Sequence, residues 1–234
     1  MEGKTGKGKG KKNSFKAKLL STYYGNPMKD MKLIAVAGEN GEVEVAHFVH
    51  EILKEAGQPV AIFAAPAKFK ISALYKFLSE AWKAGANYVV VTAPTEAIEE
   101  GVFANLPVHV VAMTDSLPGE AYHETMAKLF KGSPEYVVLN RDDENFDQFV
   151  DFAGTAGTLL YGTDRTSHIQ IVSSKLYKKG VEATLNIGGI RFTVASFLTS
   201  ESAISYMACA AAVADALHIA PEKITEGLAN YEPV

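Results

Sequence analysis

The sequence predicts a three-layer α/β domain in which helices flank a mainly parallel sheet, with a small antiparallel hairpin beside it. Three observations support this fold class. Short segments that are apolar throughout alternate with segments of helical periodicity, and two segments of strict apolar and polar alternation follow later. The composition fits a folded core, because 47% of the 234 residues are hydrophobic and 21% are charged.

Five apolar segments have the length and composition of buried strands. The first, Lys32–Ala37, reads KLIAVA and is followed directly by Gly38. Because both faces of such a strand are apolar, each is expected to lie in a parallel sheet that is covered on two sides. The other four predicted strands are Pro59–Ala65, Tyr88–Thr92, Val108–Met113 and Tyr136–Leu139.

Apolar residues at intervals of three and four indicate helices between and around these strands. Gly57 and Gly85 end two of them, and Gly25-Asn26-Pro27 ends the first. A proline suits the first turn of the last helix. The predicted helices cover Phe15–Tyr24, Val45–Ala56, Leu74–Trp82, Ala203–Leu217 and the segment after Pro221.

The hairpin is predicted over residues 181–196. Apolar and polar residues alternate over residues 181–187 and again over 190–194, and Gly188-Gly189 lies between the two segments. Two alternating segments joined by two glycines are typical of an antiparallel hairpin. Since the sequence has no internal repeat, a single domain is predicted over residues 19–234.

A basic, disordered tail is predicted to precede this domain, over residues 1–18. The tail holds seven lysines and one acidic residue, for a net charge of +6, whereas the rest of the chain has a net charge of −10. An acidic domain is a poor surface for nucleic acid, so nucleic acid is not expected as a partner. The tail could contact phosphates or anionic lipid, although its Gly/Lys composition is typical of a solvated arm.

The chain is expected to be soluble and cytoplasmic, without insertion into a membrane. No apolar segment follows the lysines of the tail, so no signal peptide is expected. The longest apolar segment, Tyr206–Ala214, is too short to span a bilayer. The single cysteine, Cys209, excludes a disulfide scaffold and fits a reducing compartment.

The order strand, glycine-rich loop and helix occurs in the segment Ile34–Glu44. Backbone N–H groups converge at such a loop and the helix dipole favours an anion, so Gly38, Asn40 and Gly41 are candidate nucleotide-binding residues. A working phosphate loop also needs a lysine and a hydroxyl that holds Mg²⁺, but this chain has Glu-Val there. The alternative is a plain strand-to-helix turn, in which acidic side chains stabilise the first helical turn.

The segment that starts at Tyr23 and contains this loop resembles the central, ATP-binding domain of the Mur ligases. It is most similar to the UDP-MurNAc-tripeptide synthetase type. In that family the loop reads TGTNGKTT, and Gly38, Asn40 and Gly41 fall on its G, N and G. The resemblance covers about residues 20–234.

The resemblance implies a P-loop-type fold with ATP and Mg²⁺ as cofactors. It also implies descent from ligases that activate a carboxylate as an acyl phosphate and couple it to an amino acid in peptidoglycan precursor synthesis. The segment VVLNRDD, residues 137–143, matches the family's V-V-N-x-D-D and assigns Asn140 and Asp143 to the adenine side, although a plain turn also explains them. Complete members have three domains, and this chain is expected to lack the N-terminal UDP-sugar domain and the C-terminal amino-acid domain.

The chain departs from the family at the residues that carry the chemistry. Glu42, Val43 and Glu44 replace the loop lysine and two threonines. No metal ligand and no catalytic residue is therefore assigned. Four further departures are Thr92–Glu96 in place of a Mg²⁺-binding Glu and Ser-Ser-His, Asp115-Ser116 in place of Asp-His, Ser200–Tyr206 in place of Gly-x-Phe-Asn-x-x-Asn, and Lys128 as the nearest counterpart of the carbamylated lysine.

These departures predict weak or lost ATP binding and little or no ligase or ATPase activity, and they leave Mg²⁺ binding open. The first hypothesis is a degenerate, non-catalytic domain, a pseudoenzyme that serves as a binding or scaffold protein for a protein partner or a nucleotide-sugar ligand. Two alternatives remain. One is an active ATP-dependent amide ligase subunit that partner chains complete, and the other is an adaptor that binds anionic polymers through its basic tail.

Overall fold

The computed structural model describes residues 15–66 and 69–231 of the chain. Its strands are β1 (Lys32–Ala37), β2 (Val60–Phe63), β3 (Tyr88–Thr92), β4 (Val108–Met113), β5 (Tyr136–Asn140), β6 (Gly157–Gly162), β7 (Ile169–Tyr177), β8 (Gly180–Ile187) and β9 (Ile190–Ser196). They form one sheet in the order β2-β3-β1-β4-β5-β6-β7-β8-β9. Neighbours from β2 to β7 are parallel, and β7, β8 and β9 are antiparallel.

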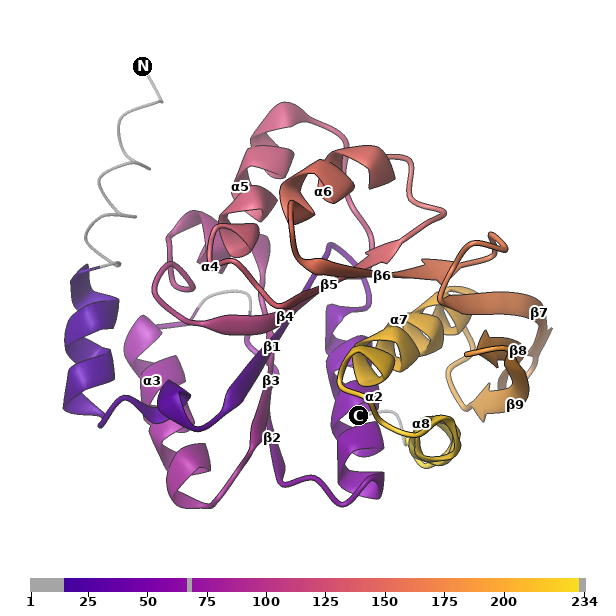
Figure 1. The fold of residues 1–234 in the computed structure, drawn as a ribbon, viewed down its shortest axis with the longest axis horizontal. Coiled ribbons are helices and arrows are strands. Elements are labelled where there is room, and N and C mark those ends of the chain that lie inside the picture. Colours follow the sequence, from indigo (N-terminus) through magenta and orange to yellow (C-terminus); the bar gives the residue numbers. More distant parts are fainter. Residues whose placement is uncertain (1–14, 67–68, 232–234) are drawn as a thin grey trace.

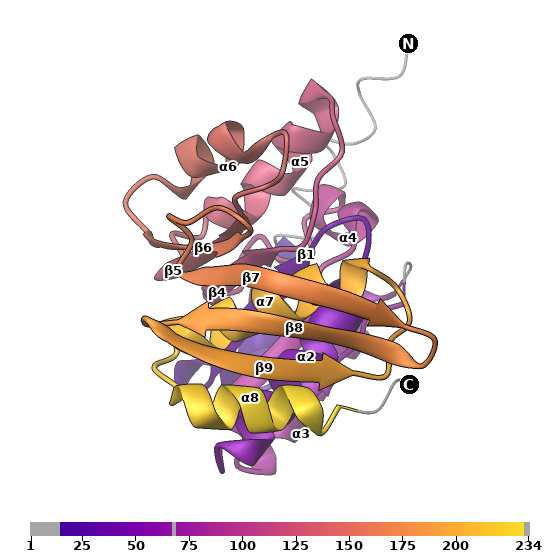
Figure 2. The same ribbon diagram turned by 90° about the vertical axis from the view of Figure 1, so that its right-hand side faces the viewer.

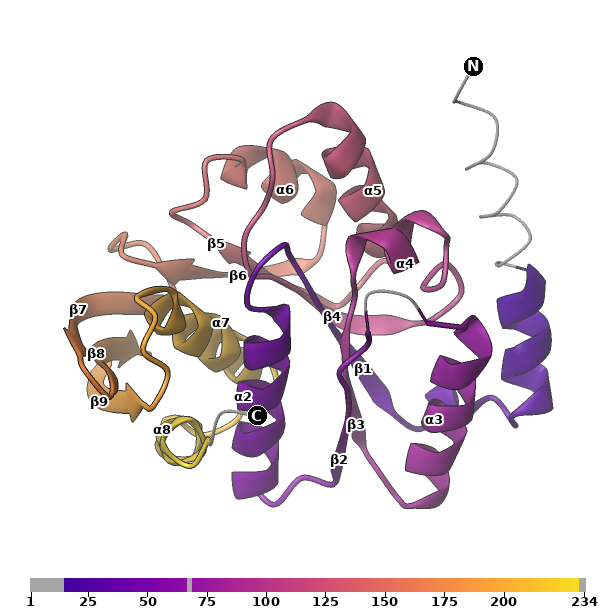
Figure 3. The same ribbon diagram turned by 180° about the vertical axis from the view of Figure 1, so that it is seen from behind.

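Helices cover both faces of the parallel part of the sheet. One face carries α2 (Glu42–Glu55), α7 (Ser202–Ala216) and α8 (Pro221–Ala229), as Figures 1 and 3 show from opposite sides. The opposite face carries α3 (Ile71–Lys83), α4 (Thr95–Glu99), α5 (Glu120–Phe130) and α6 (Phe146–Ala153). The predicted three-layer α/β fold is thus confirmed. A short 3-10 helix, η1 (Pro27–Lys29), precedes β1.

Each of the strands β1 to β6 contributes to two hydrophobic cores. In β1, Ile34 and Val36 belong to the core under α2 and α7, whereas Leu33 and Ala35 belong to the core on the opposite face. Successive side chains of a strand point to opposite faces, so the continuous apolar runs follow from burial on both sides. Cys209 lies in the first of these cores and is fully buried.

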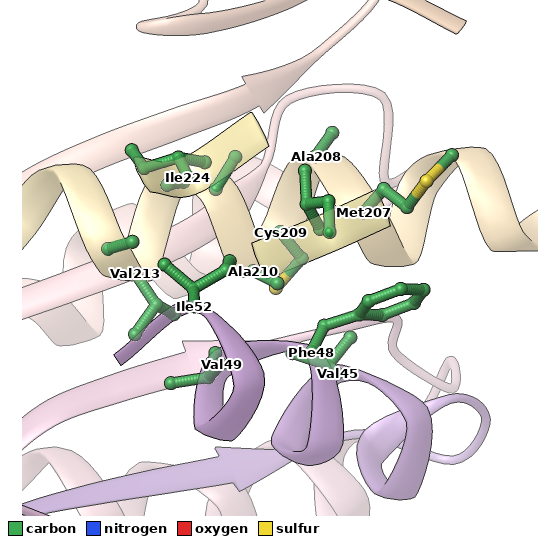
Figure 4. Close-up of a cluster of buried hydrophobic side chains, with 14 of the residues drawn as sticks. Val45, Phe48, Val49, Ile52, Met207, Ala208, Cys209, Ala210, Val213 and Ile224 are labelled. Carbon is green, nitrogen blue, oxygen red and sulfur yellow. The ribbon is translucent and has the colours of Figure 1, made fainter. Parts of the chain in front are cut away.

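The packing of α8 on α2 is unusually close. A Cβ at Gly227 of α8 would lie 2.4 Å from Cα of Ile52 and 2.8 Å from its backbone nitrogen. Figure 4 shows Ile52 on the face of α2 that meets α7 and Ile224 of α8. Polar contacts join the same two helices, because the Glu55 carboxylate accepts hydrogen bonds from Lys223 Nζ at 3.4 Å and Asn230 Nδ2 at 3.1 Å.

The antiparallel strands curve over α7 and α8, as Figure 2 shows. In β8, Val181, Ala183, Leu185 and Ile187 point into the core and Glu182 points to solvent. Gly188 and Gly189 have φ values of 59° and 88°. Two consecutive positive φ values make the tight two-residue turn that joins twisted strands, so the predicted hairpin is confirmed.

Residues 15–23 are helical, and they overlap the tail predicted over residues 1–18 by four residues. Ala17 is fully buried, and Leu20 and Tyr24 pack against the core on the α3 side. The helix predicted over Phe15–Tyr24 is thus confirmed over residues 15–23, and residues 15–18 belong to this packed helix instead of to a disordered tail. Residues 1–14 of the predicted tail lie outside the described residues. In the described part of the chain, no helix has the length and apolar character needed to cross a bilayer.

Candidate nucleotide site

The predicted loop lies at the carboxyl edge of the sheet, between β1 and α2. β1 pairs with β3 on one side and β4 on the other, and the register places Ala37 beside Met113. The residues that follow β1 and β4 therefore meet across this edge. Gly38 lies so close to β4 that a Cβ there would approach Thr114 Oγ1 to 1.9 Å and Asp115 Oδ1 to 2.8 Å.

The Asp115 carboxylate binds this loop from the neighbouring strand end. Its Oδ1 accepts hydrogen bonds from the backbone N–H of Glu39 at 2.7 Å and of Asn40 at 3.0 Å. Its Oδ2 accepts one from Asn40 Nδ2 at 2.7 Å. Backbone N–H groups are the donors that a loop of this kind offers to phosphate. Two of them are bound here to a side chain of the protein itself.

Tyr161 of β6 anchors the residues that precede Asp115. Its side chain is fully buried, and its hydroxyl donates to the carbonyl oxygens of Met113 at 2.9 Å and Thr114 at 2.8 Å. Burial raises the pKa of Tyr161 well above its usual value, so the hydroxyl keeps the proton that it donates. The carboxylate that holds the loop is therefore itself fixed to the sheet.

Further carboxylates surround the loop. Glu42 and Glu44 lie in the first turn of α2, where the helix dipole favours negative charge. The pKa of Glu42 is raised, first by burial and then by three nearby carboxylates, while a hydrogen bond from its own backbone N–H lowers it. Glu39 accepts a hydrogen bond from Thr95 Oγ1 at 2.9 Å. The loop therefore carries a concentrated negative charge.

The ring of Tyr206 in α7 covers the end of the loop at Gly41. A Cβ at Gly41, whose φ is 81°, would lie 2.1 Å from Cε1 of that ring, so only glycine fits there. Burial raises the pKa of Tyr206, a hydrogen bond with Ser202 lowers it, and the charges of Glu44, Asp115 and Glu42 raise it further. The aromatic ring thus fills space directly against the loop backbone.

A cavity of about 470 Å³ opens beside the loop, on the side of α4 and α5. Four carboxylates line it, from Glu39, Glu42, Glu96 and Glu99, and none of the described lining residues is basic. Like charges about 4 Å apart repel by roughly 1 kcal/mol in water and about 4 kcal/mol near a protein surface. The electrostatic potential of this cavity therefore opposes an anionic ligand.

Asn140 is the last residue of β5 and Asp143 lies in the loop that follows, both at the same edge of the sheet, and both side chains have polar partners there. Asn140 Oδ1 accepts from the backbone N–H of Asp142 at 3.0 Å. Asp143 Oδ1 accepts from Ser116 Oγ at 2.6 Å and from the backbone N–H of Asn145 at 2.8 Å. Ser116 directly follows Asp115. Through the bonds of Ser116 to Asp143 and of Asp115 to Glu39, this segment connects the predicted adenine-side loop with the predicted phosphate loop.

The remaining family positions do not assemble a metal site. In residues 15–66 and 69–231, no three His, Cys, Asp or Glu side chains are grouped as metal ligands. Glu96 lines the cavity from the first turn of α4. Lys128 is exposed on α5, where its Nζ lies 3.5 Å from the carbonyl oxygen of Glu99.

Comparison with known families decides the lineage of this site. The family described as "Mur ligase middle domain" matches residues 36–214. The chain belongs to the Mur ligase family. It is a central domain of that family, whose lineage is ATP-dependent ligation in peptidoglycan precursor synthesis.

Individual Mur ligases are similar to this chain over about half of their own length. The UDP-N-acetylmuramoyl-L-alanyl-D-glutamate–2,6-diaminopimelate ligase of Clostridium tetani is 27% identical over an alignment of length 203, which covers 76% of this chain and 41% of the ligase. The enzyme of the same name from Bacillus licheniformis is 26% identical over an alignment of length 258, which covers 93% of this chain and 50% of the ligase.

Solved Mur ligase structures share the fold. A structure of a UDP-N-acetylmuramoyl-L-alanyl-D-glutamate–2,6-diaminopimelate ligase superposes with a TM-score of 0.84 at 18% identity, over 97% of this chain and 51% of that one. The MurF ligase of Thermotoga maritima in complex with ADP superposes with a TM-score of 0.70 at 19% identity, over 95% of this chain and 53% of that one.

Two residues that shape this Mur ligase site were not among the predicted site residues. Asp115 and Tyr206 are remote in sequence from the loop, and both lie in segments that depart from the family's pattern. Asp115 follows the rule that the carboxyl ends of adjacent parallel strands converge, whereas Tyr206 comes from α7, which packs over that edge. Applying that rule requires knowing that β4 is the neighbour of β1, which the sequence alone does not state.

Glu42→Gln is expected to stabilise the protein at neutral pH. The ordinary pKa of this carboxyl group is 4.5, and the folded state raises it. Because the folded state then holds the proton more tightly than the unfolded chain, wild-type stability falls as the pH rises from 4.5 through the folded pKa. Glutamine does not titrate, so the variant keeps the stability that the wild type loses.

Thermal unfolding of both proteins over this pH range provides the measurement. Glu222→Gln, in the exposed first turn of α8, is the control and is expected to give no gain. The difference between Glu42→Gln and wild type should shrink towards zero below pH 4.5. A difference that is the same at every pH would contradict the role assigned to Glu42 titration.

Proposed function

We propose that this protein is a non-catalytic member of the Mur ligase lineage, which binds a protein partner or a nucleotide-sugar ligand instead of turning over ATP. The observation that carries the proposal is the binding of Asp115 to the loop. Its carboxylate takes the backbone N–H groups of Glu39 and Asn40, which an anion would need. A polyphosphate would have to displace this carboxylate and lie among the others.

The residues present do not fit Mg-ATP. A phosphate loop uses a lysine against the β- and γ-phosphates and a hydroxyl on Mg²⁺, and Glu42 and Val43 supply neither. A catalytic phosphoryl-transfer site works almost entirely by positioning and by neutralising charge. The acidic cavity beside the loop adds charge of the wrong sign. The Tyr206 ring against Gly41 supports the same conclusion, because it covers the backbone at the start of α2.

Incubation with ATP and Mg²⁺ tests the proposal. We expect no phosphate release above the buffer control, and calorimetry should give a dissociation constant weaker than about 1 mM. Thermal shift with ATP, ADP and UDP-sugars identifies any ligand of the folded state, since such a ligand raises the melting temperature. Phosphate release that is abolished by Asn40→Ala would overturn the proposal.

The second candidate function is that of an active amide ligase subunit completed by partner chains. The cavity of about 470 Å³ at the carboxyl edge favours it, because this edge is where ligands bind in open α/β sheets. The same phosphate-release assay distinguishes the two functions. ATP turnover that appears only when a partner chain is added would support this candidate against the first.

A further inference from the structure

The helix over residues 15–23 has an exposed apolar stripe. Phe15 is 68% exposed, Leu19 57% and Tyr23 80%. These residues are spaced by four, and in a helix with 3.6 residues per turn they lie along one face. Large apolar side chains that together form an exposed stripe on a helix mark an interaction surface.

The helix is held on the domain by its opposite face. Ala17 is fully buried, and Leu20 and Tyr24 pack against the core beside α3. The carbonyl oxygen of Tyr24 also accepts a hydrogen bond from Ser79 Oγ of α3 at 3.4 Å. Figures 1 and 3 place this helix at the side of the domain, next to α3. The stripe therefore points away from the protein.

Positive charge surrounds the stripe. Lys16 and Lys18 are exposed, and at 100° per residue they lie on either side of it. The chain before the helix carries five more lysines, and residues 1–18 have a net charge of +6 while the rest of the chain has −10. The net positive charge of this acidic protein is thus concentrated in the part of the sequence that leads into the apolar stripe.

We propose that the helix over residues 15–23, with Lys16 and Lys18 beside its apolar stripe, is an anchor that binds the surface of an anionic lipid membrane. The helix lies in the plane of the headgroups, with Phe15, Leu19 and Tyr23 at the level of the upper acyl chains. Lys16 and Lys18 contact the anionic headgroups. An apolar stripe flanked by lysines is the pattern of interfacial helices, and stable attachment takes two signals such as these.

Other occupants fit these observations less well. Three side chains offer far less area than the roughly 1,200 Å² that a stable protein interface buries, which argues against a second copy of this chain. Nucleic acid would be attracted by the lysines, but an apolar stripe gives it no phosphate contact, and the acidic domain repels it. Only a lipid surface uses both the charge and the stripe.

Sedimentation of the full chain with vesicles tests the proposal. Vesicles of phosphatidylcholine mixed with phosphatidylglycerol should bind it at least about tenfold more tightly than vesicles of phosphatidylcholine alone. The variant Phe15→Ser/Leu19→Ser/Tyr23→Ser should lose at least about tenfold of that affinity. Since the three side chains are exposed, its melting temperature should not change; if it does not fold, Leu19→Ser alone retains the test with a smaller loss.

Matched controls separate the stripe from general surface hydrophobicity. Ile190 and Phe197, 55% and 66% exposed, lie at the two ends of β9, which Figure 1 shows on the side of the domain opposite the helix over residues 15–23. The variant Ile190→Ser/Phe197→Ser therefore removes similar apolar surface and should leave binding unchanged. Lys16→Gln/Lys18→Gln should weaken binding and its salt dependence, whereas Lys175→Gln/Lys178→Gln, which are also exposed, should not.

A fluorescent label reports the depth of the helix. Cys209 is the single native cysteine and is fully buried, so Leu19→Cys can be labelled selectively. Emission should shift to the blue with anionic vesicles, and a label on Ile190→Cys should not respond. The proposal is overturned if vesicles do not bind, or if the stripe variant binds them as well as wild type. It is also overturned if the stripe variant instead loses RNA binding or self-association.

Discussion

A variant that carries Glu42→Lys, Val43→Thr and Glu44→Thr is expected to bind Mg-ATP at least about tenfold more tightly than the unchanged protein. It removes two carboxylates from the first turn of α2 and changes the charge of the loop by +3. It also supplies the lysine and the hydroxyls that a phosphate loop uses. Charge-assisted hydrogen bonds at roughly 1.5–3 kcal/mol each account for a gain of this size.

The structure indicates which residue limits the gain. The Tyr206 ring lies against Gly41, so adding Tyr206→Asn should strengthen binding further by uncovering the loop backbone. Asp115 should then exchange its hydrogen bonds with Glu39 and Asn40 for those of water or ligand. Turnover is not expected to return, since no metal-ligand group is assembled in residues 15–66 and 69–231.

Calorimetry with Mg-ATP measures the effect on each protein. Glu182→Lys with Glu222→Thr is the matched control, because it changes the charge by the same +3 at exposed positions on β8 and α8. It should leave the affinity close to that of wild type. Tight ATP binding by the unchanged protein would contradict the prediction. A folded triple variant that gains no affinity would contradict it as well.

Gly227→Ala is expected to destabilise the protein by at least about 2 kcal/mol. The added Cβ would lie 2.4 Å from Cα of Ile52, and backbone atoms of α2 cannot yield as a flexible side chain would. The helices α2 and α8 must then separate, which opens the packing around Ile52 and Ile224 that Figure 4 shows. The loss is diagnostic because alanine favours a helix over glycine by about 1 kcal/mol elsewhere.

Denaturant unfolding of wild type and variant measures this loss. Gly132→Ala provides the control, because a Cβ there would meet its nearest neighbours at an ordinary 3.7 Å. It should change the free energy of unfolding by less than about 0.5 kcal/mol. Equal stability of Gly227→Ala and wild type would show that α8 does not press against α2 as described.

The sequence predicted those elements whose burial leaves a simple pattern. β1 and β4 are buried on both faces and read as continuous apolar runs, and the β8–β9 hairpin alternates with glycines at its turn. β7 was not predicted, because its second half is exposed and carries Ser173, Ser174 and Lys175. α4 was missed as well, since five residues are too few to show a helical period.

The sequence predicted the part of the candidate site whose residues are neighbours in sequence, and not the contacts between distant segments. Gly38, Asn40 and Gly41 lie in the loop where the sequence places them, and that they bind nucleotide stays a prediction. The hydrogen-bond partner of the Asn40 side chain is Asp115, which is 75 residues away and follows the end of β4. The sequence cannot supply that contact, because it depends on β1 lying between β3 and β4, and strand order is a property of the whole sheet.

The contact between α2 and α8 also bears on how the chain folds. The two hydrogen bonds of this contact span 168 and 175 positions of the sequence. The helix α2, which is synthesised early, therefore completes its packing only after α8 has been synthesised. Contacts between residues so far apart in sequence slow folding, because the chain loses the entropy of closing a long loop before these contacts stabilise it. Until α8 docks, the apolar face of α2 has an incomplete cover. A nascent chain that pauses before residue 221 would therefore expose hydrophobic surface of α2, which is the kind of surface that chaperones bind.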